Sequence, residues 1–80
     1  MRVNLNEFQN KVEKGLDIII DIRGNEYFIG AWYDTKRVIS KTPNGPSSYY
    51  SNAREMLSDH RIDDTPLSEL IDEIEIIYNA

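Results

Sequence analysis

The strongest structural signal in this sequence is a pair of alternating segments, residues 16–23 and 26–33, joined by Gly24-Asn25. Glycine and asparagine tolerate positive φ angles, so this dipeptide favours a two-residue turn between antiparallel strands. Such a turn places Arg23 opposite Glu26, a pair of opposite charges. Because the turn chemistry and the apolar alternation agree, they predict a hairpin. The predicted pairs on its apolar face are Ile22 with Tyr27, Ile20 with Ile29, Ile18 with Ala31, and Leu16 with Tyr33.

The second face of this hairpin is mixed in character. The same turn would pair Asp21 with Phe28, Ile19 with Gly30, and Asp17 with Trp32. Two alternatives follow for this face: it packs beneath C-terminal helices, or it stays partly open as an aromatic patch. In the second case, a glycine among aromatic residues would let a ligand or partner approach the backbone closely.

The N-terminal segment predicts an amphipathic helix over residues 4–14. Leu5, Phe8 and Val12 recur at helical spacing and form one apolar stripe. Asn4 is a suitable N-cap, because its side chain can accept a hydrogen bond from a free backbone N–H of the first turn.

The middle of the chain predicts further short elements. Residues 37–41 are expected to form a third strand, reached through a turn around Asp34-Thr35-Lys36. Residues 42–50 contain Pro43-Asn44-Gly45-Pro46, which favours a loop. A short helix is expected over about residues 52–58.

The C-terminal segment is compatible with two structures. Its apolar residues match a helical stripe, yet Glu73 to Tyr78 also alternate and include several β-branched side chains. We favour a helix over residues 66–72, with Pro66 in its first turn, followed by a strand over residues 73–78. The alternative is a single helix, which would leave Ile76 outside the stripe.

Together these elements predict one α+β domain over residues 1–80. It consists of an N-terminal helix, a three-stranded antiparallel β-meander, short C-terminal helices and a possible fourth C-terminal strand. The helices are expected to pack on one face of the sheet.

Charge is distributed unevenly along the chain. The first 50 residues hold seven basic and six acidic side chains, whereas the last 30 hold two basic and eight acidic ones, and the net charge is −5. An acidic chain repels phosphate backbones, so we expect no nucleic-acid partner. The longest apolar run is too short to span a membrane, and the N-terminus lacks an apolar signal segment. We therefore expect a cytoplasmic protein with no membrane partner.

The sequence shows no arrangement of residues that is typical of catalysis. Cysteine is absent, His60 is the single histidine, and the four glycines are scattered. These facts disfavour thiolate sites, metal sites and phosphate-binding loops. We expect a protein that is not an enzyme and needs no cofactor or metal, with His60 on the surface at a helix end.

Aromatic residues provide the candidate binding site. Phe28 and Trp32 lie on the second face of the hairpin, Arg37 is on the adjoining strand, and Tyr49 and Tyr50 precede the second helix. Tryptophan, tyrosine and arginine are the residue types enriched at protein interfaces.

Several short motifs resemble those of small uncharacterised proteins from Firmicutes bacteria and their phages. They are Asp17-Ile18-Ile19-Ile20-Asp21-Ile22, the segment Gly-Asn-Glu-Tyr-Phe-Ile-Gly at residues 24–30, Ile62-Asp63-Asp64-Thr65-Pro66-Leu67, and Ile74-Glu75-Ile76. The resemblance implies a phage or mobile-element context, with a host cytoplasm as the location, and assigns no activity or functional residue.

Three functions are compatible with these features. The first is a binding protein that acts through protein–protein contact, in its most concrete version a phage-borne inhibitor of a host or defence protein. The second is a binder of a small nucleotide-derived ligand, with Phe28, Trp32 and Arg37 as its wall. The third is a structural protein that self-associates through an exposed strand edge.

Overall fold

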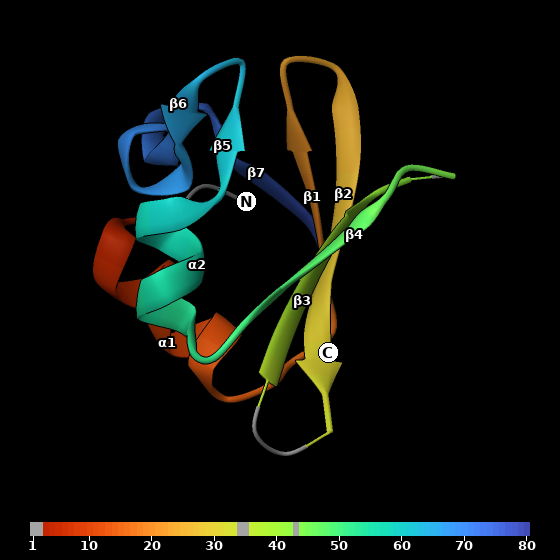
Figure 1. Ribbon diagram of the computed structural model, residues 1–80. Helices are drawn as coiled ribbons and strands as arrows, with labels where there is room; N and C mark the ends of the chain where they lie inside the picture. Colours follow the sequence, from red (N-terminus) through yellow and green to blue (C-terminus); the bar gives the residue numbers. More distant parts are fainter. Residues whose placement is uncertain (1–2, 34–35, 43) are drawn as a thin grey trace.

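A five-stranded antiparallel sheet forms the largest part of the protein, in a computed structural model that describes residues 3–33, 36–42 and 44–80 (Figure 1). The strand order is β4-β3-β2-β1-β7. The α+β class is thereby confirmed, with a larger sheet than the sequence predicts. The five strands are β1 (Ile18–Ile22), β2 (Asn25–Trp32), β3 (Lys36–Lys41), β4 (Ser47–Tyr50) and β7 (Glu75–Asn79).

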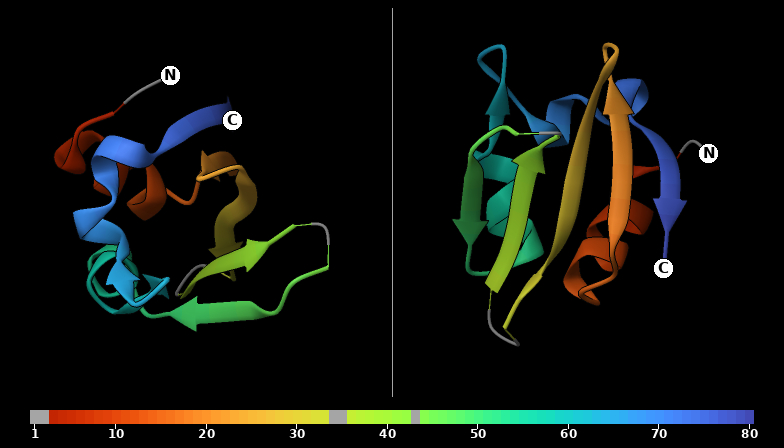
Figure 2. Two further views of the ribbon diagram at one scale, coloured as in Figure 1. Left: turned by 90° about the horizontal axis from the view of Figure 1, so that it is seen from above. Right: turned by 90° about the vertical axis from the view of Figure 1, so that its right-hand side faces the viewer.

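Two α-helices, α1 (Leu5–Glu13) and α2 (Ala53–Asp59), lie on one side of this sheet (Figure 2). Each helix begins at an asparagine cap: Asn4 Oδ1 accepts from the Glu7 N–H at 2.8 Å, and Asn52 Oδ1 accepts from the Glu55 N–H at 2.8 Å. Both predicted helices are therefore confirmed. They pack on the inner face of the sheet, where the core consists mainly of Phe8, Val12, Ile18, Ile20, Ile22, Ile29, Ile39, Met56, Leu57, Leu67 and Ile74.

The β1–β2 hairpin is present, but its turn differs from the predicted one. Its two central residues are Arg23 and Gly24, with φ angles of +54° and +83°, so both have the positive φ of a type I′ turn. The register prediction was therefore wrong by two residues in every pair. The observed pairs are Ile22 with Asn25, Asp21 with Glu26, Ile20 with Tyr27, Ile19 with Phe28, and Ile18 with Ile29.

A shift of two residues leaves every side chain on its predicted face, because side chains alternate along a strand. The apolar face therefore still points into the core. Arg23 is held in this turn by its guanidinium, which contacts Glu73 at 2.6 Å and Asp63 at 3.1 Å. These partners lie 50 and 40 residues away along the chain, so no local pattern reveals them.

Two segments differ in type from the prediction. Residues 47–50, expected in a loop, form β4, which pairs with β3 from Arg37↔Tyr50 to Ser40↔Ser47. The expected helix over residues 66–72 is replaced by two 3₁₀ turns, η1 (Leu67–Glu69) and η2 (Ile71–Glu73). Parts of the predicted turns at Asp34-Thr35-Lys36 and Pro43-Asn44-Gly45-Pro46 lie outside the described residues.

The C-terminus forms the predicted strand. β7 pairs with β1 through Ile20↔Ile76 and Ile19↔Tyr78, with a bulge between these pairs. A second, small sheet is formed by β5 (Arg61–Ile62) and β6 (Thr65–Pro66), which lie above the end of α2 in Figure 1.

The observed turn can be tested by substitutions at Gly24 and Asn25, the two residues of the predicted turn. Gly24→Ala is expected to lower the free energy of unfolding by about 1 kcal/mol, because an L-residue other than glycine is disfavoured at this φ. Asn25→Thr is expected to change it by less than about 0.5 kcal/mol, because Asn25 is a strand residue. Urea unfolding of the two variants provides the measurement. An Asn25→Thr cost as large as that of Gly24→Ala would contradict the observed turn.

Candidate functional site

The face of the sheet turned away from the helices carries a continuous set of apolar side chains. Figure 2 (right) shows this face toward the viewer, with α1 and α2 behind the sheet. Strand pairing places Ile19 between Phe28 and Tyr78, and Val38 between Gly30 and Tyr49. We call this surface the outer face and define its apolar part as Ile19, Phe28, Trp32, Val38, Tyr49 and Tyr78.

The aromatic residues at one end of the outer face contact one another. The ring centroids of Trp32 and Tyr49 are 5.6 Å apart, and those of Trp32 and Tyr33 are 5.3 Å apart. Trp32 is 47% exposed and Tyr49 is 48% exposed. The alternative in which this face packs beneath C-terminal helices is therefore wrong, and the partly open patch is the observed arrangement.

Gly30 does not offer the bare backbone that the sequence suggests. A Cβ atom at Gly30 would lie 2.8 Å from Phe28 Cζ, so the ring of Phe28 already covers this glycine. Phe28 is half-buried as a result. The glycine allows the aromatic ring to lie close to the strand, and a partner would meet the ring rather than the backbone.

Carboxylates lie across the other end of the outer face. Asp21 is paired with Glu26 on one side and with Glu75 on the other, so three acidic residues occupy one row of three strands. Like charges placed directly opposite each other destabilise a sheet, and this row therefore lowers the stability of the isolated fold.

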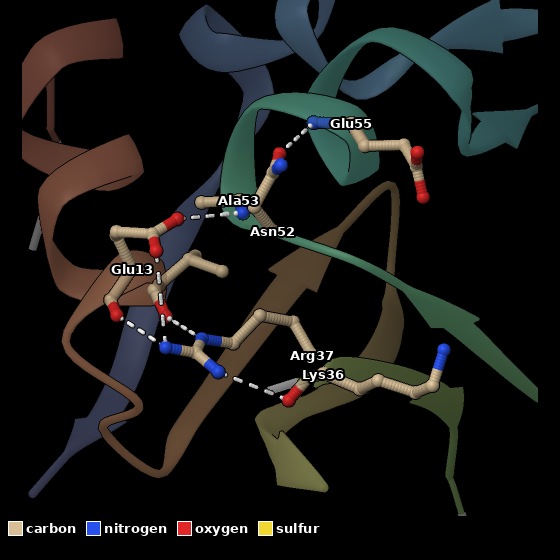
Figure 3. Close-up of polar contacts among 7 residues, drawn as sticks. Glu13, Lys36, Arg37, Asn52, Ala53 and Glu55 are labelled. Carbon is tan, nitrogen blue, oxygen red and sulfur yellow. Dashed lines mark hydrogen bonds and ion pairs between the residues drawn. The ribbon is translucent and has the colours of Figure 1, made fainter. Parts of the chain in front are cut away.

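Arg37 lies on the opposite side of the sheet from the aromatic patch. It is 9% exposed and donates from Nε to the Val12 carbonyl at 2.9 Å and from Nη2 to the Glu13 carbonyl (Figure 3). A third bond runs from Nη1 to the Lys36 carbonyl at 3.0 Å. Arg37 therefore satisfies carbonyls at the C-terminal end of α1, and the predicted ligand wall of Phe28, Trp32 and Arg37 does not form.

Glu13 connects the same junction to the second helix. Its Oε1 accepts from the Ala53 N–H at 2.9 Å, at the first residue of α2, and its Oε2 lies 3.9 Å from Arg37 Nη2 (Figure 3). We call Glu13, Arg37 and the α2 N-terminus the helix junction.

Replacement of Arg37 tests this structural role. Arg37→Met is expected to lower the free energy of unfolding by about 2–4 kcal/mol, because carbonyls of α1 lose their buried donor. Lys36→Met is the matched control, since Lys36 is exposed and pairs with Trp32 on the outer face. It is expected to change stability by less than about 0.5 kcal/mol in urea unfolding. Equal effects at the two positions would contradict the assignment.

Tyr50 also faces the inner side, where it contacts His60. The Tyr50 hydroxyl and His60 Nδ1 are 2.9 Å apart, and the two rings meet edge to face. His60 lies at the end of α2, as predicted, but it is half-buried and held by Tyr50 rather than fully exposed. Burial lowers the pKa of His60 below its ordinary value of 6.5.

This shift predicts how stability depends on pH. Since the folded protein binds the histidine proton less readily than the unfolded chain, the contribution of His60 is complete above pH 6.5. It is lost as pH falls from 6.5 through the lower folded-state pKa. We expect the free energy of unfolding to decrease from pH 7.5 to 5.5, and the decrease to be smaller in His60→Gln. An NMR titration of the imidazole with a midpoint above 6.5 would contradict this.

Other kinds of site are not apparent in the described part of the chain. No group of three or more histidine, cysteine, aspartate or glutamate residues is arranged to hold a metal ion among these residues. None of the helices in residues 3–33, 36–42 and 44–80 has the length and apolar character needed to cross a membrane.

Comparisons of the chain with protein-family models, curated proteins and solved structures find no match. The resemblance to small Firmicutes and phage proteins therefore stays a prediction, and the candidate site depends on its geometry. Of the predicted site residues, Phe28, Trp32 and Tyr49 share the outer face, while Arg37 and Tyr50 lie on the inner side. Ile19, Val38 and Tyr78 belong to the outer face but were not predicted as site residues.

Proposed function

We propose that the protein is a binding module that docks a partner protein on the outer face. The observation that supports this most directly is the placement of both α-helices on the inner side, which leaves Trp32, Tyr49 and Tyr78 about half exposed on a continuous sheet surface. An exposed apolar patch that is bordered by polar residues is characteristic of interaction sites. Rigid aromatic side chains lose little conformational entropy when a partner covers them.

The charged residues of the outer face indicate what kind of partner surface would fit it. The described outer face carries the acidic row of Asp21, Glu26 and Glu75, and Lys36 is the basic residue at its aromatic end. A partner with lysine or arginine residues beside an apolar surface would complement this arrangement. Such a partner would also relieve the repulsion within the acidic row, which the free protein cannot do. If the resemblance to phage proteins reflects origin, the partner is a bacterial host or defence protein whose action the module inhibits.

The partner can be identified by photo-crosslinking, and its affinity for variants of the outer face can then be measured. A photo-crosslinker introduced as Tyr49→benzoylphenylalanine in a bacterial lysate is expected to capture a protein that Leu5→benzoylphenylalanine does not. Leu5 is the matched control, because it is an exposed apolar residue on α1. Capture alone identifies the partner. Support for the proposal comes from the purified complex, where Trp32→Ala is expected to weaken binding about 30-fold and Leu5→Ala to leave it unchanged.

A second set of variants tests the acidic row. Replacing Asp21, Glu26 and Glu75 by their amides is expected to weaken binding at low salt and to reduce its salt dependence, because complementary charges accelerate association.

Unchanged affinity in Trp32→Ala would contradict the proposed face. A concentration-dependent dimer that Trp32→Ala abolishes would show instead that the face joins two copies of this chain.

A further inference from the structure

A separate cleft lies on the inner side of the sheet, where the β5–β6 hairpin approaches β2, β3 and β4. Its volume is about 270 Å³. This space can admit a small organic molecule. The cleft is lined by Tyr27, Ile39, Lys41, Pro46, Ser48, His60, Arg61, Ile62 and Asp63.

Hydrogen-bond donors dominate the polar part of this lining. Lys41 and Arg61 are cationic, and Arg61 uses Nη1 to donate to the Asp64 carbonyl at 2.9 Å, which leaves further guanidinium N–H groups. His60 is engaged at Nδ1 by the Tyr50 hydroxyl at 2.9 Å, so Nε2 is the ring nitrogen that remains for a ligand. The hydroxyl groups of Ser48 and Tyr27 complete the set of polar side chains that can donate.

The single carboxylate of the lining is already paired. Asp63 Oδ2 accepts from Arg23 Nη1 at 3.1 Å, so the turn between β1 and β2 supplies a cation to this carboxylate. The lining therefore holds two cations, Lys41 and Arg61, against one carboxylate, which shares the Arg23 guanidinium with Glu73, in a chain whose net charge is −5. This local reversal of charge favours an anionic ligand.

The rest of the lining is apolar. Ile39, Ile62 and Pro46, together with the ring of Tyr27, form a surface against which a compact hydrocarbon group can pack. Small-molecule sites commonly combine such an apolar surface with a few convergent polar groups. Tyr50 strengthens this arrangement, because its contact with His60 Nδ1 at 2.9 Å holds the imidazole in position before a ligand arrives.

We propose that this cleft binds a small organic anion, in which a phosphate or carboxylate group contacts Lys41 and Arg61 and a compact apolar group packs on Ile39 and Ile62. The site is distinct from the outer face, because Tyr27, Ile39 and Ser48 lie on the inner side of the sheet. It therefore does not depend on the proposed function.

The test is an NMR titration of the whole chain with phenyl phosphate, benzoate and inorganic phosphate as probes. Phenyl phosphate or benzoate is expected to shift the amide signals of Ser48, His60 and Ile62 in a saturable way, while the Trp32 indole signal stays constant. Arg61→Gln and Lys41→Gln are each expected to weaken this binding at least tenfold, as the loss of a charged hydrogen bond implies. Arg54→Gln, at an exposed position on α2, is the matched control and is expected to bind normally.

Each result decides the proposal. Whichever organic probe binds more tightly identifies the anionic group that the cleft prefers. Inorganic phosphate that binds as tightly as phenyl phosphate would overturn the role of the apolar surface. Shifts that persist unchanged in both Arg61→Gln and Lys41→Gln, or that do not saturate, would overturn the site itself. The spectra of the unliganded variants also show whether each variant is folded, and two independent substitutions keep the test valid if one of them disrupts the β5–β6 hairpin.

Discussion

The helix junction is the interaction on which the arrangement of this small fold depends. The Arg37 guanidinium enters from β3 and binds the carbonyls of Val12 and Glu13 at the end of α1. The Glu13 carboxylate then accepts from the first N–H of α2. The ends of two short helices, whose backbone groups would otherwise lack partners, are thereby joined to the sheet at one point. The buried charge of Arg37 is tolerated because its hydrogen bonds to backbone carbonyls replace those that the guanidinium would make with water.

The two helices that meet at this junction cover one face of the sheet and leave the other face open. Because α1 and α2 are both held on the inner side, the aromatic residues of the outer face have no covering helix. Phe28 takes the place of a covering helix at one point, because its ring lies over Gly30 and protects the strand backbone there. Trp32 and Tyr49 stay exposed. The acidic row of Asp21, Glu26 and Glu75 adds repulsion to the same surface. A face that is both apolar and electrostatically unfavourable when free is consistent with a surface that is completed by a partner.

The inner side of the sheet carries positive charge beside the β5–β6 hairpin, in contrast to the acidic row of the outer face. There the β5–β6 hairpin, the turn at Arg23 and the strand ends bring Lys41 and Arg61 close to an apolar surface. The pairing of Arg23 with Asp63 and Glu73 serves two purposes in this region. It holds a turn residue that has a positive φ angle, and it offsets part of the charge of the carboxylate that would repel an anion from the cleft. One ion pair therefore links the hairpin turn to the proposed ligand site.

Local patterns were sufficient to predict the α+β class, both helices, the hairpin and the strand character of the C-terminus, because capping residues and apolar periodicity act over a few residues. They also predicted which side chains of the hairpin share a face, since alternation survives a register shift of two.

They did not predict the register itself, because Arg23 occupies the turn with the help of Asp63 and Glu73, which are distant in sequence. β4 was missed for a related reason: Ser47–Tyr50 become a strand by pairing with β3. Arg37 was assigned to the wrong surface because the direction of its side chain depends on carbonyls of α1 that only the packed structure brings near.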